Sequence, residues 1–193
     1  MTEQRRNAGR ASVGRVQPVE DLIEDPVLKQ RYVFRREGEV LQVEVWVDPG
    51  GGVVPHVHPT FEERFRVLSG EVTFEVARET VVARAGEEAL VPAGTRHTYR
   101  NEGSEQAHFV TDASPPVPAL QGFLEDAAAL ARGGKMIRPG IPGRRGILPA
   151  AVMARHYRPH VRLLFPPMIV QRVVLDPLAR LGERRGLRAG ELA

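Results

Sequence analysis

The sequence has 193 residues, of which 42% are hydrophobic and 26% charged, the composition of an ordinary folded protein. It contains no cysteine, so disulfide bonds and thiolate metal sites are excluded, and any metal must be held by nitrogen and oxygen. The basic N-terminus has no apolar run behind it, and no stretch of about 18 uncharged apolar residues occurs, so neither a secretory signal nor a membrane span is predicted. We therefore expect a soluble cytoplasmic protein.

Charge is distributed unevenly along the chain. Residues 132–193 contain 13 Lys and Arg against 3 acids, whereas the first 131 residues contain 14 Lys and Arg against 21 acids. The simplest interpretation is that the basic part packs against the acidic part of its own chain, or of a second subunit in a homodimer. Contact of the basic part with an anionic lipid surface is the alternative. No nucleic-acid partner is expected, because no nucleic-acid-binding motif accompanies the charge.

The N-terminal half begins with a tail and continues as predicted strands. Residues 1–18 are polar and rich in Arg and Gly, which is typical of a disordered basic tail. Residues 19–32 are predicted to be partly helical, with the helix ending near Gln30. Apolar and polar residues alternate over residues 40–47, which predicts a strand. Further short strands are predicted over residues 64–68, 72–77, 81–84, 90–92, 97–100 and 107–111.

Turn signals between these strands recur about every 8–12 residues, which is typical of an antiparallel sandwich or barrel. We predict a β-barrel domain over residues 19–113, ended by a run of prolines that cannot donate to a central ladder. Residues 114–193 are predicted to be a Pro-rich linker and a basic α-helical extension. Its helices are expected over residues 120–131, over residues 148–157 and from Pro166 onward, with a restart where Asp176 can cap.

Two histidines spaced two apart suggest a metal site. His56 and His58 lie in an extended run, so a strand would point both imidazoles to the same side. Glu63 stands at odd spacing from His58 and would face away in an unbroken strand, but a break at Pro59 and Thr60 can reset the alternation. A third ligand on the same side is thus possible in principle.

Two separate segments also match a known pattern at fixed spacing. The first is Gly-x5-His-x-His-x4-Glu-x6-Gly and the second is Gly-x5-Pro-x-Gly-x2-His-x3-Asn. The matching residues are Gly50, His56, His58, Glu63 and Gly70, then Gly86, Pro92, Gly94, His97 and Asn101. On these ten residues the chain resembles the cupin superfamily, as a small single-domain member of bacterial type with a helical C-terminal extension.

The resemblance implies a mainly β fold, namely a cupin-type double-stranded β-helix, or jelly-roll barrel, with the α-helical extension added. It implies one divalent transition metal held by His56, His58, Glu63 and His97. Glu62 competes with Glu63 for the carboxylate position, and the glycine spacing of the pattern favours Glu63. Iron, manganese, nickel, copper and zinc all suit three imidazoles and a carboxylate, so the ion is not identified.

Function in this superfamily resides in the pocket, and alternation along strands predicts its lining. The expected lining residues are Phe65, Val67, Val72, Phe74, Val76 and Tyr99. Tyr99 is the candidate catalytic proton donor, although its hydroxyl could equally serve only to satisfy a neighbour. His108, His156 and His160 lack a ligand pattern and are interpreted as structural.

A largely apolar pocket beside a metal suits a small aromatic or enolic ligand better than a sugar phosphate. We therefore predict an oxidoreductase of dioxygenase type, since a metal can polarise an enol and, if redox-active, engage oxygen. A metal-assisted isomerase and a non-catalytic ligand-binding or sensor protein are the alternatives that the sequence leaves open.

Overall fold

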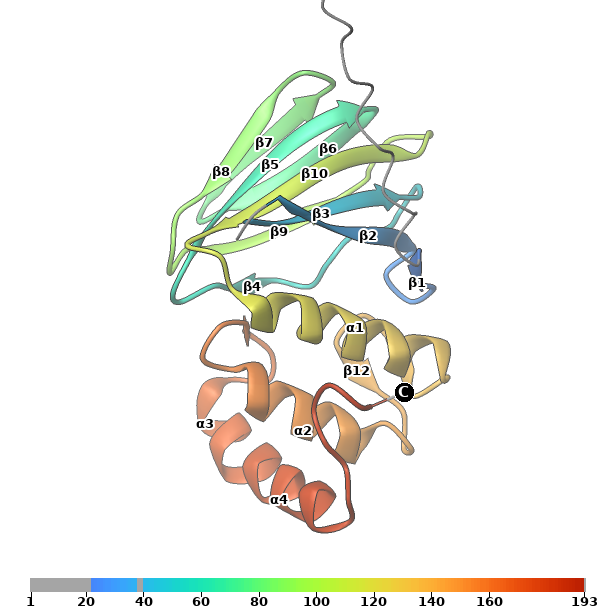
Figure 1. Ribbon diagram of the computed structural model, residues 1–193, viewed down its shortest axis with the longest axis vertical. Helices are drawn as coiled ribbons and strands as arrows, with labels where there is room; N and C mark the ends of the chain where they lie inside the picture. The colour runs from blue at the N-terminus through green and yellow to red at the C-terminus, as the bar shows by residue number, and fades with distance from the viewer. Residues whose placement is uncertain (1–21, 38–39, 193) are drawn as a thin grey trace, which may run out of the picture.

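The computed structural model describes residues 22–37 and 40–192, and the predicted tail over residues 1–18 lies outside this part. Two antiparallel sheets form a barrel, and helices lie together at one end of it (Figure 1). The predicted β-barrel with a helical C-terminal extension is therefore confirmed. Strand β10 ends at Ser114 and helix α1 begins at Pro118, so the change from strands to helices falls at the proline run.

The larger sheet has the strand order β1-β2-β3-β10-β5-β8. Its strands are β1 (Ile23–Asp25), β2 (Gln30–Glu37), β3 (Val40–Val47), β5 (Glu62–Ser69), β8 (Glu88–Val91) and β10 (Ala107–Ser114). Buried and more exposed residues alternate along β3, β5 and β10, because one face of the sheet covers the core.

The smaller sheet has the order β13-β4-β9-β6-β7. Its strands are β4 (His56–Val57), β6 (Glu71–Val76), β7 (Glu79–Arg84), β9 (Arg96–Arg100) and β13 (Arg162–Leu163). The chain approaches β4 through Gly52, where a Cβ would lie 2.2 Å from the carbonyl oxygen of Tyr99. Only glycine permits this close approach, which sets β4 against β9.

The helix predicted over residues 19–32 is wrong for the described part of that segment, which starts at residue 22 and forms β1, a turn and the start of β2. The Asp25 carboxylate accepts hydrogen bonds from the backbone N–H groups of Val27 and Leu28, both at 2.9 Å. This local turn reverses the chain, so that β1 pairs with β2 where a helix would have continued.

The space between the sheets is filled by a hydrophobic core with aromatic rings at its centre. Phe65 and Phe74 lie 4.8 Å apart between ring centroids, and both rings also contact Phe109. Burial of such rings supplies much of the stabilisation of a small barrel. Besides these three, the buried members are Tyr32, Phe34, Leu41, Val43, Val45, Val47, Val67, Val72, Ala83, Ala89, Val91, Tyr99, Ala107 and Ala128.

The extension adds helices and three short strands. Its elements are α1 (Pro118–Arg132), β11 (Met136–Arg138), β12 (Ile141–Pro142), α2 (Ile147–Tyr157), β13, α3 (Met168–Val170), the π-helical turn η1 (Gln171–Leu175) and α4 (Asp176–Arg184). The expected restart at Asp176 occurs, but its side chain makes no cap hydrogen bond and pairs instead with Arg158. In the described residues, every helix is too short or too polar to cross a bilayer.

The extension has a core of its own. Leu130 of α1, Val152 and Tyr157 of α2, and Ala179 of α4 are buried together. The Asp126 carboxylate on α1 accepts hydrogen bonds from the Tyr157 hydroxyl at 3.0 Å and from the Gly190 N–H at 2.7 Å. These contacts hold α1, α2 and the final residues together as one body beneath the barrel.

Candidate metal centre

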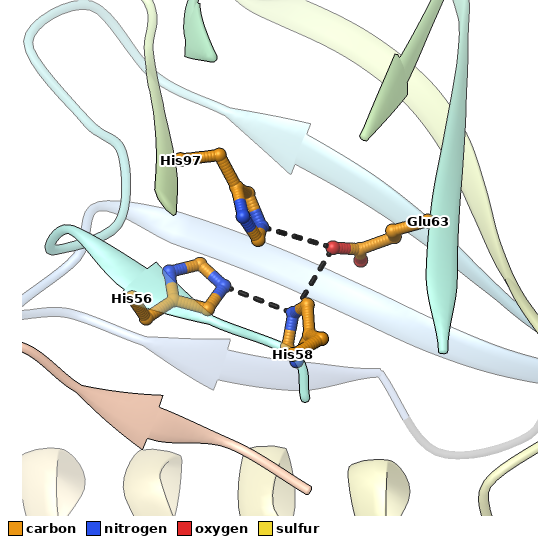
Figure 2. Close-up of side chains that lie close together, drawn as sticks. All are labelled: His56, His58, Glu63 and His97. Carbon is orange, nitrogen blue, oxygen red and sulfur yellow. Dashed lines mark hydrogen bonds and ion pairs between the residues drawn. The ribbon is translucent and has the colours of Figure 1, made fainter. Parts of the chain in front are cut away.

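Four side chains from both sheets converge at the end of the barrel that faces the extension. His56 on β4 is directly opposite His97 on β9 in the strand register, so their side chains share one face. His58 follows β4, and Glu63 comes from β5 in the other sheet (Figure 2). One ligand atom from each residue can be chosen so that all four lie within 4.8 Å of one another.

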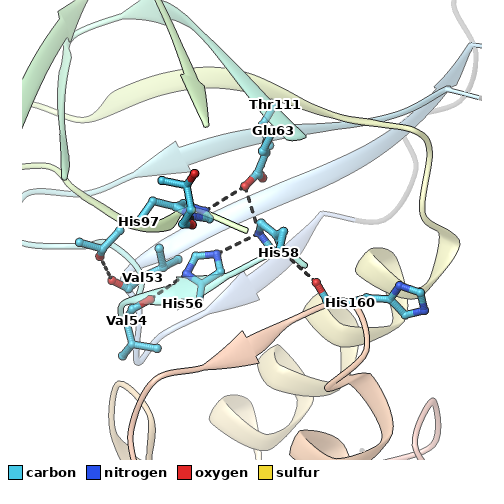
Figure 3. Close-up of polar contacts among 10 residues, drawn as sticks. Val53, Val54, His56, His58, Glu63, His97, Thr111 and His160 are labelled. Carbon is cyan, nitrogen blue, oxygen red and sulfur yellow. Dashed lines mark hydrogen bonds and ion pairs between the residues drawn. The ribbon is translucent and has the colours of Figure 1, made fainter. Parts of the chain in front are cut away.

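Backbone carbonyls fix the hydrogen on each imidazole. The Nδ1 atoms of His56, His58 and His97 lie 2.8, 3.1 and 3.1 Å from the carbonyl oxygens of Val54, His160 and Thr95 respectively. Figure 3 shows the His56 and His58 contacts. A carbonyl oxygen only accepts hydrogen bonds, so each Nδ1 carries the hydrogen and each Nε2 presents a lone pair.

The three lone pairs face one another and a carboxylate. Nε2 of His56 lies 3.0 Å from Nε2 of His58, and one Glu63 oxygen lies 3.2 Å from Nε2 of His58 and 3.3 Å from Nε2 of His97. Among residues 22–37 and 40–192, Nε2 of His97 is buried and has no hydrogen-bond partner within geometric limits. Three imidazole nitrogens and one carboxylate oxygen at such distances can bind one ion together, so the residues fit a divalent metal.

The surroundings lower the pKa of two of these donors, His56 and Glu63. Burial, with His97 and His58 beside it, lowers the pKa of His56 to about 3. Burial alone would raise the pKa of Glu63, but the adjacent imidazoles of His58 and His97 outweigh it and hold that pKa below its ordinary value. Deprotonated donors are the form that a metal needs.

Glu63 and its neighbour Glu62 point to opposite faces of β5. Glu63 is buried and accepts a hydrogen bond from the Thr111 hydroxyl at 3.1 Å. Arg64 is exposed and Phe65 is buried, so the alternation continues inward at odd-numbered residues. The local geometry therefore brings Glu63, and not Glu62, to the three histidines.

A cavity of about 220 Å³ is lined by His56, His58 and Glu63 of the cluster, and the structure places only part of the expected lining around it. Phe65 and Tyr99 line the cavity. Val67, Val72 and Phe74 lie in the hydrophobic core and Val76 packs against that core partly buried, and these four are not among the residues that line this cavity. Alternation identified the inward face of each strand, but these four residues lie deeper in the barrel, where aromatic rings fill the space.

The Tyr99 hydroxyl donates a hydrogen bond to the Oε1 atom of Gln30 at 2.7 Å. Both residues are buried and both line the cavity. Burial raises the pKa of Tyr99 well above 10, and the charge of Glu63 adds to this rise, so the hydroxyl stays protonated. A raised pKa makes the hydroxyl a weaker acid, so the structure shows Tyr99 as a hydrogen-bond donor, here to Gln30.

Sequence reasoning missed the contribution of the extension. The carbonyl that holds His58 belongs to His160, and β13 pairs with the ligand strand β4, placing Leu163 opposite His56. Every residue has a backbone carbonyl, so the sequence does not indicate which carbonyl contacts His58. The expectation that His160 is structural concerned its imidazole, which lies 3.4 Å from the Thr60 hydroxyl and outside the four-residue cluster.

Comparisons with known proteins agree with this geometry. The family model of the cupin domain matches residues 43–111. Polyketide synthase CurC of Streptomyces cyaneus is 33% identical over 107 residues, which cover 52% of this chain and 70% of CurC. Protein SchB of Streptomyces halstedii is 36% identical over 74 residues, which cover 37% of this chain and 52% of SchB.

Among solved structures, the protein TT1209 from Thermus thermophilus is 27% identical with a TM-score of 0.44, over 50% of this chain and 97% of that protein. The extension from Ser114 onward lies outside the range that the cupin model matches. The domain match spans His56, His58, Glu63 and His97, and the similarity to CurC extends over more than two thirds of that protein. This chain therefore belongs to the cupin superfamily.

Proposed function

We propose that this protein is a metal-dependent oxidoreductase of dioxygenase type that acts on a small aromatic or enolic compound. The observation that carries the proposal is the cluster of three imidazoles and one carboxylate, of which His56, His58 and Glu63 line a cavity with a mostly apolar lining. A divalent first-row metal bound there would supply Lewis acidity and, if redox-active, a means of engaging dioxygen.

The residues of the chain have separate roles in this proposal. His56, His58, Glu63 and His97 hold the metal, and the carbonyls behind the imidazoles keep the ligand nitrogens pointing inward. Tyr99 is the candidate proton donor, because burial keeps its hydroxyl protonated beside the cavity. The apolar lining excludes water, which strengthens electrostatic interactions inside the site.

The relationship to CurC supports the substrate class. CurC is named a polyketide synthase, and we take from that name a substrate whose carbonyl groups can enolise. Enols and phenols are the compounds whose oxygen atoms a metal can bind while their apolar parts contact the cavity wall. A metal-assisted isomerase would use the same ligands on the same enols, without consuming oxygen.

Elemental analysis tests the metal centre first. Wild-type protein should retain about one divalent metal per chain, His97→Ala should lose it, and His108→Ala should keep it, because His108 bonds to Glu44 away from the cluster. Oxygen uptake by the metal-loaded protein with a panel of enols, phenols and 1,3-diketones then tests the reaction. Equal metal content in all three proteins would overturn the metal centre. Binding without oxygen uptake would favour a sensor, and isomerised product an isomerase.

A further inference from the structure

The cavity beside the candidate metal centre has walls from two parts of the chain. His56, His58 and Glu63 line its barrel side, and residues of the extension line the other side. Helix α1 lies directly under this end of the barrel, with α2 and α4 below it (Figure 1). The barrel therefore supplies the ligands, and the extension supplies the wall that faces them.

Every side chain that the described extension contributes to this cavity is apolar. The contributors from α1 and α2 include Leu120, Phe123, Leu124, Ala127, Ala150 and Ala154. Residues 132–193 contain 13 Lys and Arg, yet all of these basic residues lie outside the lining. The part of a ligand that contacts this wall must therefore be uncharged and apolar, since a charged group would find no counter-charge there.

Polar groups gather on the barrel side, and several already have partners. The Thr111 hydroxyl donates to Glu63, the Tyr99 hydroxyl donates to Gln30, and the Tyr32 hydroxyl donates to the carbonyl of Leu124. A sugar needs many donors and acceptors around its whole rim, and this cavity offers them on one side only. The arrangement suits a ligand with oxygen atoms at one edge and hydrocarbon elsewhere.

The cavity volume limits the size of the apolar part. An apolar cavity of about 150 Å³ is large enough to bind benzene. The cavity here is about 220 Å³, which leaves room for a second fused ring but not for a long chain. The two walls together thus define both the polarity and the size of the ligand.

We propose that the C-terminal extension sets the substrate class of this site, which is an uncharged aromatic compound of one or two fused rings with neighbouring oxygen atoms at one edge. The oxygen edge faces His56, His58 and Glu63, and the rings lie against α1 and α2. This inference rests on the proposed function for the direction of the oxygen edge. The inference that the extension forms an apolar wall depends only on the residues that line the cavity.

Calorimetric binding to full-length protein loaded with redox-inert Zn²⁺ tests the proposal without turnover. The three probes are naphthalene-2,3-diol, catechol and oxalate, which share two neighbouring oxygens but present two rings, one ring and none. Naphthalene-2,3-diol should bind at least tenfold more tightly than catechol, and oxalate should bind most weakly. Equal affinity for the three probes would overturn the proposal while leaving the metal centre intact.

Cavity-filling variants test the wall itself. Ala127→Phe and Ala154→Phe each place a ring into the cavity from a different helix, and each should weaken binding of naphthalene-2,3-diol at least tenfold with oxalate binding unchanged. Ala129→Phe is the matched control, because Ala129 lies on α1 outside the lining. Thermal unfolding identifies any variant that fails to fold. Wild-type affinity in both folded variants would overturn the proposal.

A separate measurement distinguishes failure of the wall from failure of the metal centre. Naphthalene carries no oxygen, so its binding to metal-free protein depends on the apolar wall alone. Binding that Ala127→Phe blocks supports the wall even if elemental analysis finds no metal in wild-type protein. Absence of naphthalene binding overturns the wall even if metal is present.

Discussion

The metal centre depends on which ring nitrogen of each histidine carries the hydrogen. In each of the three imidazoles, Nδ1 contacts a backbone carbonyl. These contacts orient the rings so that the Nε2 atoms point toward the centre of the cluster. In the part of the chain that the structure describes, Nε2 of His97 is buried with no hydrogen-bond partner and lies 3.3 Å from a Glu63 oxygen. These buried polar atoms therefore lower the stability of the folded protein until a cation binds between them.

Acid should destabilise the metal-free protein. The pKa of His56 is about 3 against an ordinary 6.5, so below pH 6.5 the unfolded chain takes up a proton that the folded state does not. The pKa of Glu63 is also lowered from 4.5, so its contribution is present above pH 4.5 and is lost as the pH falls through its folded-state value. The free energy of unfolding, measured in urea with a chelator present, should decrease from pH 6.5 toward pH 3. His56→Gln should show a shallower decrease, and an identical slope would contradict this assignment.

The four candidate ligands were inferred from the resemblance to the cupin pattern, and the structure brings them together. The backbone carbonyls that contact their Nδ1 atoms could not be predicted, since every residue has a carbonyl. Of the six predicted lining residues, Phe65 and Tyr99 line this cavity, because alternation gives the face of a strand but not the position of each residue along the barrel.

Among the elements, β13 connects the extension to β4, the strand that carries His56. It is two residues long and pairs with β4, and the loop that follows it is held by Gln171. The Gln171 side chain is buried and donates 2.8 Å hydrogen bonds to the carbonyls of Leu163 and Pro166. The Gln171 amide thus holds the loop after β13, and β13 in turn pairs with β4.

Gln171→Leu should lower the free energy of unfolding by about 1–3 kcal/mol, because two partly buried carbonyls lose a hydrogen bond from a buried side chain. Gln106→Leu is the control, since its side chain makes an exposed hydrogen bond to Asp48 and should cost no more than about 0.5 kcal/mol. Urea unfolding of the three metal-loaded proteins measures both effects. Equal stability of the two variants would show that the loop does not depend on this amide.

Longer elements with a clear period could be predicted, including β3 and the helices near residues 120–131 and 148–157. The segment from residue 22 to Gln30 could not, because a local turn at Asp25 overrides its weak helical pattern. Strand β13 was missed because two residues show no periodicity and their partner lies far away in the sequence.

At the scale of the whole molecule, the barrel fold followed from the ten matching residues, whereas the position of the extension did not. The charge asymmetry predicted that the basic part packs on the acidic part, and the extension does lie against the end of the barrel (Figure 1). Its basic side chains do not line the cavity, while its apolar residues contribute to its own core and to the cavity wall. The homodimer and the lipid-surface alternative stay predictions.

The pairing of β4 with β13 also bears on attempts to simplify the protein. Strand β4 has β9 on one side and β13 on the other, so its peptide groups have neighbours in both directions. In a chain shortened to residue 117, β4 would become an exposed edge strand of the sheet, which can pair with a strand from another molecule. On a sizing column the shortened chain should elute as species that grow with concentration. A single small species at every concentration would show that the barrel stands alone.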